Sequence, residues 1–493
     1  MALILKQEPR LEPRHEAFLY QLQAVEAVQD REYAALFHEQ GLGKTKIGLD
    51  LALHWLRSSV VDSVIIVTKR GLIQNWMDEI KTHTHFQARV LEQDRRANFY
   101  AFNSPARLYL AHYEVFRSEE SRLRLFQKTR QIGVILDEAQ KIKNPEAELT
   151  QTFLRLAPGF TRRVIMTGTP VANRPYDIWS QIQFLDQGRS LGSSFERFRQ
   201  ELEMGNDLAD DPEAQERFQR ELSTVFGKIR PFTVRETKAS AGIELPEKHI
   251  ENVSVDLLED QRALYESFKT DLRAEVVRDG ALTEDNAEAL LKRLLRLVQV
   301  ASNPSLVDES YAGTPSKLLV TEELVGKAVR SSSKAIIWTN FIATADWLRE
   351  RFKDDGAEVL HGNKSITDRN AAVRAFKEDP ACRVLVATPA SAKEGLTLTV
   401  ANYAIFFDRS FSLDDYLQAQ DRIHRISQKQ QCFIYNLIAR DTVDEWVDML
   451  LAAKRLAAQL AQGDIEVEEY ASRSNYDYGR VVREILGLRG AVE

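Results

Sequence analysis

Cysteine is scarce in this chain of 493 residues, which has only Cys382 and Cys432. Two cysteines can form at most one bridge and cannot build the disulfide framework of a small secreted domain, so we expect a reducing compartment. No run of about 18 apolar residues occurs, so no membrane span is expected. The start of the chain lacks the apolar core and cleavage site of a signal peptide. We therefore expect a cytoplasmic location in a bacterial or phage-infected cell, or a nuclear one in a eukaryote.

The chain also has no excess of basic over acidic residues. The chain has 66 Lys and Arg residues against 73 Asp and Glu residues, which gives a formal net charge of -7. This balance argues against a uniformly basic coat for nucleic acid. It allows a local basic groove, because phosphate binding depends on where the charge lies.

Short apolar runs alternate with amphipathic helical stretches twice along the chain. The first set of expected strands covers residues 34–37, 63–67, 107–110, 133–136 and 163–166. The second set covers residues 334–338, 357–360, 383–387 and 403–407. Strands that alternate with helices predict parallel sheets covered by helices. Because a charged stretch with helical periodicity separates the sets, from about residue 186 to 316, we expect two α/β lobes joined by a helical insertion.

A glycine-rich segment follows the first expected strand. It reads HEQGLGKT over residues 38–45 and contains Gly41, Leu42, Gly43, Lys44 and Thr45. The segment leads into an expected helix that begins at Lys44. Glycines let the backbone fold closely around phosphates, and a helix N-terminus offers free N–H groups to an anion. Lys44 would hold the β- and γ-phosphates of ATP, and the Thr45 hydroxyl would ligate Mg²⁺. The alternative is a plain glycine turn, and His38 departs from the glycine that the usual pattern has there.

Two acidic residues, Asp137 and Glu138, end the fourth expected strand. A buried parallel strand delivers such side chains to the sheet edge where α/β proteins bind ligands. Asp137 would hold Mg²⁺ through water, and Glu138 would polarise the attacking water. On this motif alone, a solvated acidic strand end remains the alternative.

Two further motifs follow in order: MTGTPVAN over residues 166–173 and QAQDRIHRISQ over residues 418–428. With the glycine-rich segment and the acidic pair, they closely resemble the Swi/Snf-type ATPases, a branch of the superfamily-two helicases that move on duplex DNA. The resemblance covers about residues 20 to 447. It implies two RecA-like parallel-sheet lobes of the P-loop NTPase fold with helical insertions between them.

We expect the domains to divide accordingly. Residues 1–235 form the ATP-binding lobe, in which the helical insertion starts at about residue 186. Residues 236–316 form a helical protrusion and linker, residues 317–455 the C-terminal helicase lobe, and residues 456–493 a tail.

The resemblance also implies roles for other residues. It assigns nucleotide binding to Gln21 and Gly395, and coupling of hydrolysis to lobe movement to Gln140, Thr167, Gly168, Thr169 and Gln418. It assigns nucleic-acid contact to Lys69, Trp76, Tyr113, His361, Arg369, Thr388 and Ser391.

Arg422 and Arg425 match the family's arginines that reach across to ATP. Their i, i+3 spacing would place them on one face of a helical turn. A guanidinium grips phosphate in a fork and, supplied from the second lobe, would stabilise charge on the transferring γ-phosphate only when the lobes close. Closure and hydrolysis would thereby be linked. The alternative is a pair of surface arginines matched with acids.

Several positions depart from the family's pattern. Gln140 replaces the more familiar histidine, and its amide can form hydrogen bonds but cannot carry charge. Lys69 stands where proline is frequent, Ser427 replaces a glycine, and Phe411 stands where tryptophan is frequent. None of these changes removes a catalytic group, so we expect an active nucleotide site.

The sequence therefore predicts an ATP- and Mg²⁺-using, DNA-dependent ATPase that translocates along duplex DNA. Contacts mainly to phosphates would make binding salt-dependent and largely independent of sequence. A protein partner or DNA shape would then supply targeting, and we expect a monomer. A strand-separating DNA or RNA helicase is the nearest alternative. A non-catalytic DNA-binding scaffold is an alternative of another class.

Overall fold

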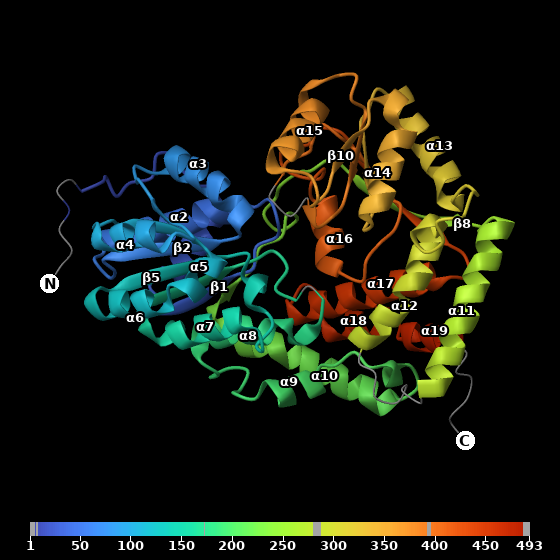
Figure 1. Ribbon diagram of the computed structural model, residues 1–493. Coiled ribbons are helices and arrows are strands. Elements are labelled where there is room, and N and C mark those ends of the chain that lie inside the picture. Colours follow the sequence, from blue (N-terminus) through green and yellow to red (C-terminus); the bar gives the residue numbers. More distant parts are fainter. Residues whose placement is uncertain (1–4, 6–7, 172, 280–286, 392–395, 487–493) are drawn as a thin grey trace. The chain divides into compact units, whose positions relative to one another are not determined.

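The computed structural model describes residue 5 and residues 8–171, 173–279, 287–391 and 396–486. They form two compact units. Unit 1 comprises Met1–Glu203, Phe218–Glu244 and Ala458–Val467, and unit 2 comprises Met204–Arg217, Leu245–Ala457 and Glu468–Glu493. Each unit contains one sheet, and every strand pair in both sheets is parallel (Figure 1). The predicted fold class, with two parallel-sheet lobes, is confirmed.

The sheet of unit 1 has the strand order β3-β4-β2-β5-β6-β1-β7. Its strands are β1 (Tyr33–Leu36), β2 (Ser63–Thr68), β3 (Arg89–Leu91), β4 (Leu108–His112), β5 (Ile132–Asp137), β6 (Arg162–Met166) and β7 (Thr233–Val234). The central strands β2 and β5 are buried along their whole length. Helices on both faces of the sheet account for this burial and for the unbroken apolar runs in the sequence.

The helices of the N-terminal half connect these strands. They are α1 (Leu19–Val28), α2 (Lys44–Arg57), α3 (Ile73–His83), α4 (Arg95–Asn103), α5 (Tyr113–Ser118), α6 (Glu120–Thr129), α7 (Glu148–Leu156), α8 (Trp179–Asp186), α9 (Phe195–Glu201) and α10 (Pro212–Ile229). The last two fall in the stretch that the sequence predicts as helical insertion.

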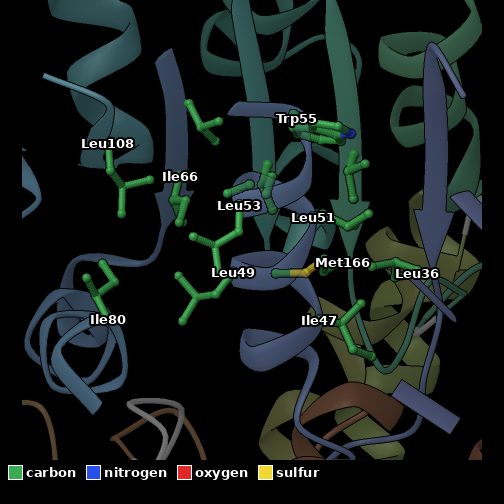
Figure 2. Close-up of a cluster of buried hydrophobic side chains, with 14 of the residues drawn as sticks. Leu36, Ile47, Leu49, Leu51, Leu53, Trp55, Ile66, Ile80, Leu108 and Met166 are labelled. Carbon is green, nitrogen blue, oxygen red and sulfur yellow. The ribbon is translucent and has the colours of Figure 1, made fainter. Parts of the chain in front are cut away.

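The core of unit 1 is built around α2 (Figure 2). That helix contributes Ile47, Leu49, Leu51, Leu53 and Trp55 to the core, and the strands contribute Leu36, Ile66, Leu108 and Met166. All nine side chains are at most 1% exposed. Because so much apolar area leaves water there, α2 is held firmly against the sheet. Its first residue, Lys44, is thereby fixed at the edge where the parallel strands end.

The sheet of unit 2 has the strand order β10-β11-β9-β12-β13-β8. Its strands are β8 (Lys248–Val255), β9 (Ala335–Trp338), β10 (Glu358–Leu360), β11 (Val384–Ala387), β12 (Tyr403–Phe406) and β13 (Cys432–Ala439). The remaining helices are α11 (Glu259–Asp279), α12 (Ala287–Ser302), α13 (Ser316–Arg330), α14 (Ile342–Arg351), α15 (Ile366–Glu378), α16 (Leu413–Gln420), α17 (Val443–Ala461), α18 (Val467–Arg473) and α19 (Asp477–Leu486). Among the described residues, none of the helices has the length and apolar character that crossing a bilayer requires.

Four strands are absent from the sequence-based expectation: β3, β7, β8 and β13. The first two lie at the edges of the first sheet and contain only three and two residues. Strand β8 is a largely exposed edge strand inside the stretch interpreted as helical linker. It pairs over its full length with β13, so the charged sequence around it is ordered by its neighbour rather than by its own apolar pattern.

Candidate functional site

The glycine-rich segment connects β1 to α2. Gly41 has φ +88° and Gly43 has φ +68°, the left-handed region that favours glycine. A Cβ on Gly43 would meet the Gln21 amide nitrogen, so that side chain would have to leave its place on the loop. The Gln21 amide and the Tyr20 hydroxyl, both on α1, each donate a hydrogen bond of 3.2 Å to the Leu42 carbonyl. The structure therefore brings Gln21 to the loop, as its predicted nucleotide role requires.

Lys44 is turned into the loop that precedes it. Its ammonium donates hydrogen bonds to the carbonyls of His38 at 2.8 Å and Glu39 at 3.2 Å. A Cβ added to Gly168 would come within 3.4 Å of the same nitrogen, so the segment after β6 lies beside the lysine. The positive charge of Lys44 also favours the ionised forms of both Asp137 and Glu138. Segments from the ends of β1, β5 and β6 thus meet at one edge of the sheet.

Asp137 ends β5 and is buried. Its Oδ2 accepts hydrogen bonds from Trp76 Nε1 at 2.8 Å and Thr68 Oγ1 at 3.1 Å. Burial and the adjacent Glu138 charge nevertheless raise the pKa of Asp137 to about 6. Among the described residues no hydrogen bond reaches Oδ1. A buried carboxylate whose charge is only partly compensated favours the binding of a cation. No hydrogen-bond donor among the described residues competes with a cation for Oδ1.

Glu138 follows with φ 56° and ψ 50°, a conformation that is costly for a residue with a side chain. Lys69 lies 3.1 Å from its carboxylate, and the Gln140 amide also donates to it. Burial raises the pKa of Glu138, but the charges of Lys69 and Lys44 outweigh this effect and hold the pKa below its usual value. Glu138 is therefore ionised at neutral pH and can accept a proton or a hydrogen bond from water.

Gln140 continues the connection toward β6. Its amide oxygen accepts a 2.8 Å hydrogen bond from the Thr167 hydroxyl, and that hydroxyl accepts a 3.1 Å bond from the Thr169 amide. The chain from Glu138 through Gln140 to Thr167 is thus continuous. The neutral amide forms these hydrogen bonds without carrying a charge, and its coupling role stays a prediction.

The predicted DNA contacts at Trp76 and Tyr113 fall on buried side chains. Their side chains are 1% and 0% exposed, and the Tyr113 hydroxyl donates a 2.8 Å bond to the Asp137 carbonyl. Both side chains therefore hold Asp137 by hydrogen bonds, and their contact with DNA stays a prediction. Lys69 is partly exposed but paired with Glu138, and its DNA contact stays a prediction.

In unit 2, Arg422 and Arg425 lie in the turn that follows α16. Arg422 Nη1 donates to the Leu396 carbonyl at 3.2 Å, and Arg425 Nη1 donates to the Thr397 hydroxyl at 3.0 Å. Both guanidinium groups therefore face the same segment, although helix α16 ends at Gln420. Gln418 is buried and donates to Asp414 within α16 at 2.7 Å. The predicted contact of the arginines with ATP and the coupling role of Gln418 stay predictions.

The remaining predicted residues of unit 2 differ in how far they are buried. His361, Thr388 and Ser391 are only 2%, 5% and 5% exposed, and Ser391 holds the Leu360 carbonyl at 2.8 Å. The three residues lie in the loops that follow β10 and β11, and their contact with DNA stays a prediction. Arg369 is half-buried and stays a prediction. Gly395, predicted to bind nucleotide, lies outside the described residues.

The edge of the first sheet fits a magnesium-bound nucleoside triphosphate. Phosphate oxygens are charged acceptors and would replace the neutral carbonyls that now engage Lys44. Among the described residues no group of three or more His, Cys, Asp or Glu side chains could hold a metal by itself. Mg²⁺ uses one or two protein oxygens together with substrate phosphates and water. Thr45 and Asp137 are the residues that would provide them.

Comparison with known proteins gives the family. The model of the SNF2-related domain matches residues 20–306, and that of the helicase conserved C-terminal domain matches residues 316–427. The first match alone covers more than half of the chain. The chain therefore belongs to the SNF2-related family, and the predicted membership among the Swi/Snf-type ATPases is confirmed.

Individual relatives are distant. The uncharacterized ATP-dependent helicase MG018 of Mycoplasma genitalium is 27% identical over 86% of this chain and 40% of its own length. The ISWI chromatin-remodeling complex ATPase ISW1 of Saccharomyces cerevisiae is 25% identical over 86% of this chain and 39% of its own length. This chain thus spans about two fifths of the length of these curated relatives. A solved SWI2/SNF2 ATPase core of Sulfolobus solfataricus in complex with dsDNA is 24% identical with a TM-score of 0.41, covering 95% of this chain and 98% of that one.

Proposed function

We propose that this protein is a DNA-dependent ATPase that couples ATP hydrolysis to translocation along duplex DNA and thereby remodels or displaces protein–DNA complexes. One observation carries the proposal. The phosphate loop, the acidic pair and the Thr167–Thr169 segment meet at one sheet edge and are joined by the Glu138–Gln140–Thr167 hydrogen bonds. Family membership supplies the context in which such an edge hydrolyses ATP.

The residues divide the work. Gln21 and the loop backbone bind the nucleotide, Lys44 holds its terminal phosphates, and Thr45 and Asp137 hold Mg²⁺. Bound Mg²⁺ would neutralise phosphate charge as the γ-phosphoryl group is transferred. Glu138, ionised at neutral pH, orients the attacking water and accepts its proton. When the γ-phosphate leaves, Gln140 and Thr167 change their hydrogen-bond partners.

We assign Arg422 and Arg425 to the stabilisation of charge on the γ-phosphate. Both are presented from the turn after α16 and held by the segment Leu396–Thr397. Guanidinium groups can leave such neutral acceptors for a phosphate, because charged hydrogen bonds are about twice as strong as neutral ones. A requirement for both arginines would restrict hydrolysis to a state in which the two units cooperate.

Duplex DNA is the proposed track, bound mainly through phosphates and without strong sequence preference. The similar proteins described above support two versions of this activity. One is an ATP-dependent helicase, and another is a chromatin-remodeling complex ATPase. The second is compatible with remodelling of protein–DNA complexes, and the first with strand separation as the alternative. A separate partner or DNA shape would supply targeting.

The ATPase rate of the purified chain without nucleic acid, with duplex DNA, with single-stranded DNA and with RNA tests the proposal. We expect the largest stimulation by duplex DNA, and displacement of a third strand from a triplex in the presence of ATP. Lys44→Ala should abolish both activities. Stimulation by single strands or RNA alone, with unwinding of a forked duplex, would replace translocation by helicase activity. ATP turnover unchanged in Lys44→Ala would refute the site itself.

A further inference from the structure

The segment after α10 runs alongside the phosphate loop. Strand β7 pairs with β1, and the pairing continues past both strands: the Phe37 amide donates to the Val234 carbonyl and the Glu39 amide to the Glu236 carbonyl, each at 2.8 Å. The Glu39 carboxylate in turn receives a 2.8 Å bond from the Lys238 amide. The backbone that leads into the loop is therefore fixed from one side by residues about 200 positions further along the chain.

Arg235 lies at the centre of this contact. Its Nη1 donates a 2.7 Å hydrogen bond to the Phe37 carbonyl, the last carbonyl before the loop sequence that starts at His38. Its Nε and Nη2 form a fork on the carboxylate of Asp464. The two side chains are 14% and 19% exposed, so the ion pair is largely shielded from water. One guanidinium thus connects the loop entrance to a residue 229 positions away in the sequence.

Asp464 is itself held in place. It follows α17, and its amide donates to the Gln459 carbonyl at 2.9 Å, which closes the end of that helix. The preceding Gly463 has φ +73°, and a Cβ there would lie 2.3 Å from the Phe226 ring on α10. Only glycine allows this approach. The carboxylate is therefore presented to Arg235 by a packed turn rather than by a loose chain end.

We propose that Arg235 and Asp464 are positioning residues for ATP binding, so that the turn after α17 sets the geometry of the phosphate loop. Lys44 donates to the carbonyls of His38 and Glu39, directly after the carbonyl that Arg235 holds. A shift of the Phe37 carbonyl would move the loop backbone and the lysine together. The proposal rests on the ATP site of the proposed function and adds the residues that keep it in register.

The chain contains a matched control for this geometry. Arg107 forms the same fork on Glu8, with Nε at 2.9 Å and Nη2 at 2.6 Å, while its Nη1 donates to the Asp62 carbonyl at 2.9 Å. This second clamp belongs to unit 1 as well, but Asp62 precedes β2 and Arg107 precedes β4. It therefore grips the sheet at the ends of strands opposite to the phosphate loop.

The test measures KM for ATP and kcat with duplex DNA, the Kd for fluorescently labelled ADP without DNA, and thermal stability. The loop-side variants are Asp464→Asn, Arg235→Lys and the charge-swapped Arg235→Asp/Asp464→Arg, and the control variants are Glu8→Gln and Arg107→Lys. We expect KM and the Kd for ADP to rise about tenfold in the loop-side variants, as for other groups that orient a ligand-binding residue. The control variants should change neither constant.

The charge swap separates positioning from stability. It restores an ion pair, so its melting temperature should recover relative to Asp464→Asn. It does not return a guanidinium to the Phe37 carbonyl, so the weakened nucleotide binding should persist. Recovery of KM in the swap, or equal constants in the loop-side and control variants, would overturn the positioning role. Wild-type turnover that depends on Lys44 would leave the proposed ATP site standing in either case.

Discussion

Asp137 and Asp408 occupy comparable places in the two units. Each is a buried carboxylate at the carboxyl end of a parallel strand, Asp137 ending β5 and Asp408 following β12. Their hydrogen bonding differs. Asp408 accepts four bonds of 2.6 to 2.8 Å, two on each oxygen, from the Ser302 and Thr339 hydroxyls and from the backbone and side-chain nitrogens of Asn340.

The difference separates a structural acid from a functional one. Four donors satisfy Asp408, so its charge ties the ends of α12, β9 and β12 together. Asp137 receives two donors on one oxygen and lies beside Glu138, so burial of its charge is only partly compensated. A protein keeps such a group where a ligand completes it. Hydrogen-bond saturation, rather than burial or position, distinguishes the two.

The substitution Asp137→Asn should have the largest effect, which is on ATP turnover. The amide cannot hold Mg²⁺ with a negative charge, so we expect DNA-stimulated ATP turnover to fall about a thousandfold, equivalent to about 4 kcal/mol. Folding should not suffer. The folded pKa of Asp137 is raised to about 6 from 3.8, so its ionisation costs stability as the pH rises through 6. At pH 7.5 with EDTA, calorimetry should therefore show an unchanged or higher Tm, and a clearly lower Tm would break the comparison.

Asp408→Asn should show the opposite pattern. The amide keeps one acceptor oxygen and presents its own N–H groups to existing donors, so buried hydroxyl and amide groups lose their partner. We expect unit 2 to lose about 3 kcal/mol of stability, since each unsatisfied buried group costs about 1–3 kcal/mol. Denaturant unfolding followed by tryptophan fluorescence measures this loss. Stability equal to the wild type would show that Asp408 is not the structural member of the pair.

The smallest effect concerns His38 in the phosphate loop. Its ring is fully buried, and neither ring nitrogen has a hydrogen-bond partner among the described residues. Burial and the Lys44 charge lower its pKa from 6.5 to about 4. Between these values the unfolded chain binds a proton that the folded chain excludes, so folding stability is present above pH 6.5 and is lost toward pH 4.

His38→Leu removes this titration. We expect the stability difference between variant and wild type to change by about 2 kcal/mol in favour of the variant between pH 7 and pH 4. Urea unfolding at several pH values measures the difference, from which the carboxylates common to both proteins cancel. A difference independent of pH would mean that the folded and unfolded chains bind the His38 proton equally, so that burial does not lower the pKa of this side chain.

The sequence predicts the phosphate loop and the acidic pair because each is a local motif bounded by a buried strand. It also predicts both sheets, because their central strands are continuous apolar runs. The sequence does not predict the direction in which individual side chains point. Trp76 and Tyr113 lie in motifs associated with DNA, but only tertiary packing shows that both side chains turn inward to Asp137.

Contacts between segments far apart in the sequence also depend on tertiary packing, so local sequence patterns do not predict them. Nothing in the local sequence of Asp464 indicates that it meets Arg235, because the stretch around it is polar and carries no motif. Strand β8 is likewise ordered by its pairing with β13 rather than by an apolar pattern of its own. A signal that could have found the first pair is Gly463, whose left-handed turn marks the end of a helix.

The ion pair of Arg235 and Asp464 at the loop entrance has a practical consequence for the design of shortened versions of this ATPase. The matched family regions end at residue 427, and helix α17 ends at Ala461, so either would look like a natural place to shorten the chain. A version cut after α17 would retain every recognisable motif, with Asp137 and Glu138, yet lack Asp464, whereas one cut at residue 427 would also lose β13. We expect the version cut after α17 to bind ATP weakly, which would be mistaken for a low intrinsic activity of the core.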